Sequence, residues 1–149
     1  MLLADTNILS TFAKVNQLAL LFRLFGDERI GIVPAVYAEF QAGVKKGYAD
    51  LQVVIKLIQQ GQIDLAALTA QEVFWASALP VSFDAGERET LAVAKSRGCS
   101  ILTNENQIKN WCRRITLQHL RNPRESSEPP SRKAREEICS AFALFASLR

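Results

Sequence analysis

The chain has 149 residues, of which 48% are hydrophobic and 22% are charged, a composition ordinary for one globular domain with a sizeable core. Its formal net charge of +3 is mild, and the basic excess falls in residues 109–149. Three cysteines without a Cys-x-x-Cys spacing argue against a disulfide framework and a zinc knuckle, so we expect a cytoplasmic protein. The apolar runs are too short to cross a bilayer, and no secretion signal or membrane contact is expected.

The first half of the chain predicts strands that alternate with helices. Residues 2–4 are apolar and end on Asp5, which is typical of a strand buried on both faces of a parallel sheet. Pro34 suits the first position of a helix, where its missing N–H would have no partner anyway. The further elements expected here are helices over 8–13 and 17–25, a strand over 29–33, helices over 34–46 and 48–60, and a strand over 63–68.

The second half continues the alternation. Thr69 and Asp84 are each followed three residues later by Glu, which is the capping-box pattern, and they predict helices over 69–79 and 84–97. The other elements expected are a strand over 100–103, a helix over 104–113, a fifth strand over 115–117, a mobile loop over 122–131 with three prolines, and a closing helix over 132–148. This order predicts a single α/β domain over 1–149, with helices around a parallel sheet.

Acidic residues follow or flank the predicted strands. Asp5 ends the first strand, Glu39 lies in the helix after the second, Glu87 opens the helix before the fourth, and Asn104 and Glu105 follow the fourth. Parallel strands end at one edge of a sheet, so Asp5, Glu39 and Glu105 are expected at one crevice, with the switch point between the first and fourth strands. Glu87 is one helix away and is expected to reach in from the side. Carboxylates gathered there repel one another unless a cation neutralises them, and oxygen-only ligands suit Mg²⁺ or Mn²⁺.

Each acid also has a purely structural explanation. Asp5 and Glu87 fit helix caps, Glu39 fits the polar side of an amphipathic helix, and Glu105 fits the positive end of a helix dipole. The single histidine, His119, lies outside any cluster, which argues against a Ser-His-Asp or Cys-His arrangement. Glycine-rich phosphate motifs are absent from the sequence. After these exclusions, the chemistry that the sequence favours is the cleavage of phosphate esters by a metal ion with carboxylate ligands.

Four stretches together resemble a PIN domain, the nuclease fold used by VapC-type toxins. They are residues 2–7 (LLADTN), 33–40 (VPAVYAEF), 84–94 (DAGERETLAVA) and 101–105 (ILTNE). The resemblance covers residues 2–118 and implies a three-layer α/β/α sandwich, Rossmann-like, with a five-stranded parallel sheet. It also implies a homodimer.

The resemblance also implies an activity and a set of site residues. It implies an endoribonuclease that depends on Mg²⁺ or Mn²⁺ and is the toxin of a type II toxin–antitoxin pair, with RNA as substrate and a cognate antitoxin protein as partner. Asp5, Glu39 and Glu87 match the first three acidic positions. Glu105 is the expected fourth acid, and Asn104 stands where many relatives carry another acid, as a further candidate ligand.

Two alternatives stay open at this point. The uncharged Asn104 is the feature that motivates a PIN-like domain without catalysis, acting as an RNA- or protein-binding module. A nuclease directed at DNA would have the same sequence pattern. Basic side chains that could hold a nucleic-acid backbone, or simply face solvent, are Lys45, Lys46, Arg113 and Arg114.

Overall fold

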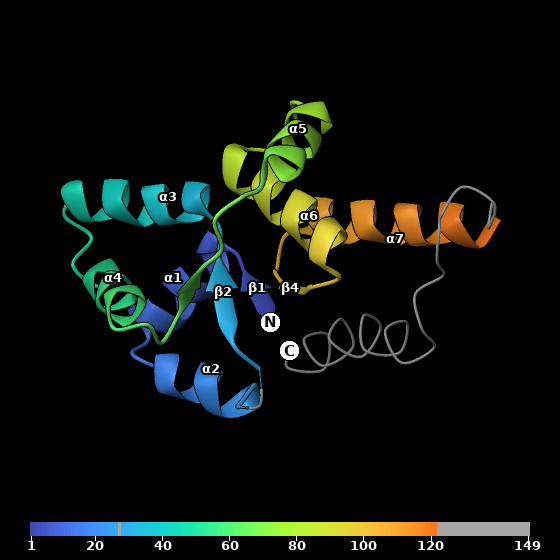
Figure 1. The fold of residues 1–149 in the computed structure, drawn as a ribbon. Coiled ribbons are helices and arrows are strands. Elements are labelled where there is room, and N and C mark those ends of the chain that lie inside the picture. Colours follow the sequence, from blue (N-terminus) through green and yellow to red (C-terminus); the bar gives the residue numbers. More distant parts are fainter. Residues whose placement is uncertain (27, 122–149) are drawn as a thin grey trace. The chain divides into compact units, whose positions relative to one another are not determined.

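The structure is a computed structural model that describes residues 1–26 and 28–121, with side chains described up to residue 114. The chain divides into two compact units, one over Met1–Thr103 and a second that begins at Asn104. The first unit holds a parallel sheet with helices packed around it (Figure 1). Within the described residues, no helix is long and apolar enough to cross a membrane.

The sheet of the first unit has four parallel strands in the order β3-β2-β1-β4. The strands are β1 (Leu2–Ala4), β2 (Ile30–Ile32), β3 (Asp64–Leu65) and β4 (Ser100–Leu102). Strand β1 is central, and its three residues are all buried. It pairs with β2 on one side, where Leu2 faces Ile30, and with β4 on the other, where Leu2 faces Ser100. The predicted α/β fold is therefore confirmed.

The strand order sets the switch point of the sheet. The chain moves from β1 through β2 to β3 in one direction and then crosses back to place β4 on the far side of β1. Neighbouring strands β1 and β4 are thus the pair at which the direction of winding reverses, as the sequence predicts. Open α/β sheets form their ligand crevice at such a place, beyond the carboxyl ends of the strands.

Six helices belong to the first unit. They are α1 (Thr6–Lys14), α2 (Leu18–Leu24), α3 (Pro34–Lys45), α4 (Leu51–Gln59), α5 (Ala70–Ala78) and α6 (Ala85–Arg97). Their ends follow local signals. Pro34 is the first residue of α3, Thr69 and Asp84 form complete capping boxes at α5 and α6, and Gly98 ends α6 in the left-handed conformation with φ of 64°.

The predicted fifth strand over 115–117 is wrong. These residues lie inside α7 (Asn106–Arg121), a helix of the second unit, so the sheet has four strands in the part of the chain that is described. Three apolar or β-branched residues carry too little periodic information to tell a strand from a helix segment, and here the helix continues through them. The predicted loop over 122–131 and helix over 132–148 lie outside the described residues. The single domain over 1–149 stays a prediction.

Candidate functional site

Asp5 lies at the switch point, directly after β1, and is buried with 7% of its surface exposed. As the N-cap of α1 it accepts a hydrogen bond of 2.7 Å from the Ile8 N–H through Oδ1. Its Oδ2 accepts a hydrogen bond from the hydroxyl of Thr103, which follows β4. The local cap and the neighbouring strand therefore orient this carboxylate together. The structural explanation for Asp5 holds, and the same cap fixes the direction of the acid at the switch point.

Glu39 lies on α3 and is partly buried. Its Oε2 accepts a hydrogen bond from the Thr6 hydroxyl, and Thr6 is the first residue of α1, next to Asp5 in the chain. The first turn of α1 thus links both acids, although they are far apart in sequence. The structure brings Asp5 and Glu39 into one neighbourhood, as the sequence predicts.

At Gly86, helix α6 lies close against side chains of α3. A Cβ on Gly86 would stand 2.9 Å from Oε1 of Glu39, 3.1 Å from Cγ2 of Val36 and 3.4 Å from Oδ1 of Asp84. Any side chain at this position would displace the Glu39 carboxylate or push the helices apart. The absence of a Cβ is therefore what lets two carboxylates, from Glu39 and Asp84, flank the same glycine.

Glu87 takes part in the capping box of α6. Its Oε2 accepts a hydrogen bond of 2.9 Å from the Asp84 N–H, and its own N–H donates to Asp84 Oδ1 over 2.8 Å. The capping explanation for Glu87 is therefore correct. Its predicted role as a metal ligand stays a prediction.

Glu89 lies two residues further along α6, and its side chain reaches α3. Its Oε2 accepts a hydrogen bond of 2.8 Å from the N–H of Ala35, the second residue of α3. A carboxylate at this end of a helix satisfies a free donor and interacts favourably with the helix dipole. Glu89 is not among the site residues that the sequence analysis predicts. Helical periodicity is the signal that would have found it, because residues 86, 89, 90 and 93 share the face of α6 whose other members are buried.

The charges that shift the pKa of Glu39 are of one sign. Partial burial raises the pKa of the Glu39 carboxyl above its usual value, and the negative charges of Asp84, Asp5 and Glu89 raise it further, against the lowering effect of the Thr6 hydrogen bond. No cationic side chain is among the causes of this shift. The protein therefore holds a carboxylate where its ionised form is disfavoured, which is a frequent property of functional sites.

The donor types at this site fit a hard divalent cation. Carboxylate and hydroxyl oxygens are ligands that Mg²⁺ and Mn²⁺ accept, and a positive charge would offset the repulsion that raises the pKa of Glu39. In residues 1–26 and 28–121, however, no three side chains among Asp, Glu, His and Cys are grouped closely enough to hold one ion. A site with three acidic ligands would therefore require at least one further acidic side chain to turn toward Asp5 and Glu39.

The remaining predicted residues are found on other elements. Asn104 and Glu105 belong to the second unit, immediately before α7, and Arg113 and Arg114 are exposed residues of that helix. Their roles stay predictions. Lys45 is exposed at the end of α3, and its neighbour Lys46 lines a pocket.

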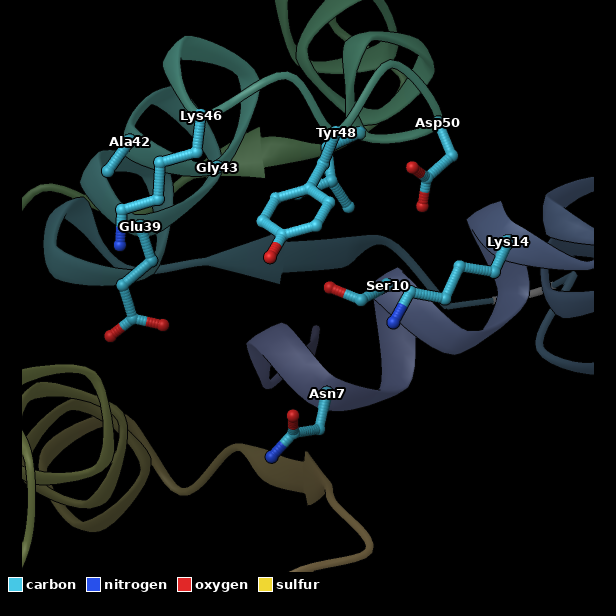
Figure 2. Close-up of a pocket in the computed structure, with 10 residues that line it drawn as sticks. Asn7, Ser10, Lys14, Glu39, Ala42, Gly43, Lys46, Tyr48 and Asp50 are labelled. Atoms are coloured by element: carbon cyan, nitrogen blue, oxygen red, sulfur yellow. The ribbon is translucent and has the colours of Figure 1, made fainter.

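This pocket lies within the first unit, between α1 and the connection from α3 to α4, and has a volume of about 400 Å³ (Figure 2). We call it the Tyr48 pocket. Its lining includes Glu39, so the pocket adjoins the group of carboxylates. The other polar side chains of its lining come from Asn7, Ser10, Lys14, Lys46, Tyr48 and Asp50.

The fold and the site define an α/β domain whose acidic side chains lie at the switch point of a parallel sheet. A family model described as a PIN domain matches residues 1–120, and the chain therefore belongs to the PIN domain family. Among solved structures, the chain is similar to one in the crystal structure of VapBC2 from Rickettsia felis bound to a DNA fragment from their promoter. The TM-score is 0.58 at 21% identity, over 73% of this chain and 91% of that chain. The curated proteins contain no match to the chain.

Proposed function

We propose that the protein is a metal-dependent endoribonuclease, most simply the toxin of a type II toxin–antitoxin pair that acts in the cytoplasm. The observation on which this proposal rests is the effect of neighbouring carboxylates on Glu39. In a chain of the PIN domain family, a partly buried carboxylate stands among three further carboxylates without a cationic partner among the groups that shift its pKa. Such an arrangement is suited to a divalent cation and to phosphate-ester chemistry.

The residues proposed to hold Mg²⁺ or Mn²⁺ are Asp5 and Glu39, with Glu87 and Glu105 as the further acids and Asn104 as an additional ligand. When bound, such an ion polarises a phosphodiester and lowers the pKa of a water molecule on it. This assignment is supported by the hydroxyl donors of the first unit, Thr103 for Asp5 and Thr6 for Glu39.

The chain's own residues contribute orientation. Thr103 and the α1 backbone hold the two oxygens of Asp5 in fixed directions, and Thr6 does the same for one oxygen of Glu39. Glu89 holds the first turn of α3, the helix that carries Glu39. Partners that fix the direction of a ligand strengthen metal sites in general, and their removal typically weakens metal affinity or activity by about 10- to 100-fold.

Partners are proposed by analogy. The structural neighbour is VapBC2 bound to a fragment of promoter DNA. We infer that this chain likewise pairs with an antitoxin protein, and that it forms a homodimer.

The test compares the wild-type protein with Asp5→Asn in the cleavage of a labelled single-stranded RNA, with Mg²⁺, with Mn²⁺ and with EDTA. Cleavage is expected only with metal and is expected to be lost in Asp5→Asn, because the amide cannot supply the negative charge. Glu28→Gln is the matched control. It also removes one carboxylate, but Glu28 lies near the N-terminal ammonium group, before β2 begins, and it should cleave as the wild type does.

Circular dichroism must show that Asp5→Asn is folded. Metal-dependent cleavage that survives in the folded variant contradicts the proposed site. A wild-type protein that binds RNA but cleaves neither RNA nor DNA with any metal supports the second reading, a binding module of the same family. Cleavage of DNA but not of RNA would show that the proposed RNA substrate is wrong and that the enzyme acts on DNA.

A further inference from the structure

The Tyr48 pocket has features that the nuclease proposal does not use. The connection between α3 and α4 places Tyr48 on its wall. Helix α3 ends in a Schellman motif, in which the Tyr48 N–H donates to the Gly43 carbonyl over 3.2 Å and the Gly47 N–H donates to the Val44 carbonyl over 3.0 Å. Gly47 has φ of +94°, a conformation that L side chains rarely adopt. The backbone of this turn therefore fixes where Tyr48 leaves α3.

The Tyr48 ring is supported on one side and open on the other. Its Cδ2 would stand 3.8 Å from a Cβ on Gly43, so the ring packs over the surface of α3. Even so, 55% of the residue is exposed. Figure 2 shows the ring reaching from the α3–α4 connection toward α1. An aromatic ring held by its backbone and open to solvent beside a pocket is a platform on which a flat ligand can stack.

Two lysines provide positive charge at the pocket. Lys14 is in the last turn of α1, and Lys46 follows the last turn of α3. In the part of the chain that the structure describes, neither ammonium group is in an ion pair. They are therefore available to an anionic group such as a phosphate.

Asp50 supplies an acceptor. It stands at the N-cap position of α4, but its side chain makes no capping hydrogen bond, and its Oδ2 is a buried oxygen without a hydrogen-bond partner. A buried acceptor that lacks a donor costs free energy, so a ligand with an N–H group at this place would be bound favourably. In Figure 2 the carboxylate lies on the same wall as Tyr48.

We propose that the Tyr48 pocket binds one unpaired base of single-stranded RNA, stacked on Tyr48, with its exocyclic amino group donating to Asp50 and its flanking phosphates beside Lys14 and Lys46. This inference rests on the proposed function for the choice of RNA as ligand. Because Glu39 also lines the pocket, a base held there lies next to the carboxylates proposed to bind the metal. The pocket would thus determine which nucleotide stands beside the bond to be cleaved.

The Asp50 carboxylate gives the pocket a base preference. Cytosine and adenine present an amino group on the edge that a carboxylate can reach. The N–H of uracil lies between two carbonyl oxygens, which repel a carboxylate. We therefore expect oligocytidine and oligoadenosine to bind more tightly than oligouridine.

The experiment measures binding of labelled oligocytidine, oligoadenosine and oligouridine of equal length by fluorescence anisotropy, with the full chain in EDTA so that no RNA is cut. Tyr48→Ala is expected to weaken binding about tenfold, whereas Tyr48→Phe, the matched control that keeps the ring, should bind as the wild type does. Asp50→Asn should remove the preference over oligouridine. Replacing Lys14 and Lys46 by Ala should lower the slope of log K against log salt by about 0.7 for each lysine.

Cleavage with Mn²⁺ is measured separately, so that the two proposals can fail independently. Wild-type binding that is undetectable, equal binding by Tyr48→Ala and Tyr48→Phe, or an unchanged base preference in Asp50→Asn each overturns the base-binding pocket. If RNA binding depends on Tyr48 but no cleavage is found, the nuclease proposal is overturned and the proposal of a base-binding pocket stands. If Tyr48→Ala cleaves RNA with the same rate and base preference as the wild type, the proposal of a base-binding pocket is overturned and the nuclease proposal stands.

Discussion

The ion pair between Glu72 and Arg97 provides a stability prediction whose magnitude follows from the structure. Glu72 on α5 is 1% exposed, and its two oxygens accept hydrogen bonds of 2.8 Å from Nε and Nη2 of Arg97 at the end of α6. Oε2 also accepts a hydrogen bond of 2.8 Å from the Thr69 N–H. The Arg97 hydrogen bonds and the Thr69 N–H lower the pKa of Glu72 from 4.5 to about 2.

This difference in pKa can be converted to a free energy. At about 1.4 kcal/mol per pH unit, the ionised form of Glu72 contributes about 3 kcal/mol to the free energy of unfolding at neutral pH. We expect Glu72→Gln to lose about that amount at pH 7, because the amide keeps the shape and one acceptor but not the charge that pairs with Arg97. Urea unfolding followed by circular dichroism measures it.

The contribution of Glu72 to the free energy of unfolding should decrease as the pH falls. The folded pKa of Glu72 lies below the unfolded value of 4.5, so the contribution is fully present above 4.5 and is lost as the pH falls toward 2. The stability difference between wild type and Glu72→Gln should therefore be constant near neutral pH and shrink in acid. Glu28→Gln is the control, because its carboxylate is 49% exposed and stands 3.8 Å from the N-terminal ammonium, a pair that contributes at most about 1 kcal/mol. A Glu72→Gln loss no larger than the control's, or a difference that does not shrink in acid, would refute this reasoning.

Three further predictions concern the candidate site. Gly86→Ala places a Cβ 2.9 Å from Oε1 of Glu39, so we expect RNA cleavage to fall by about tenfold or more, and unchanged cleavage would mean that the position of Glu39 does not matter. Glu39→Gln should raise the urea concentration at the midpoint of unfolding, measured in EDTA at neutral pH. The pKa of Glu39 is raised in the folded protein, so its charged form destabilises the fold and the uncharged amide should not; a lower midpoint contradicts this. Thr103→Val should lower the free energy of unfolding by about 1 to 2 kcal/mol through loss of the hydroxyl donor to Asp5, and Thr103→Ser should restore it; equal loss in both variants would argue against the hydrogen bond.

Much of the local structure can be predicted from the sequence. Both capping boxes, Pro34 at the start of α3 and the left-handed Gly98 at the end of α6 are found where their patterns predict them. The apolar runs that predict four of the strands are strands in the structure. The segment 115–117 shows the limit, because three residues do not distinguish a strand from one turn of a long helix.

The sequence by itself determined those features whose partners lie within about four residues, since a cap or a turn is decided by neighbouring donors and acceptors. It also singled out Asp5 and Glu39, because acids after the strands of a parallel sheet share one edge. Only the tertiary structure decided that the Thr6 hydroxyl donates to Glu39 and that Glu89 accepts a hydrogen bond from the first turn of α3. These contacts join residues 33 and 54 positions apart, and they depend on the strand order and on the close approach of α3 to α6 at Gly86. No local pattern encodes that approach, because it results from how the helices pack against one another.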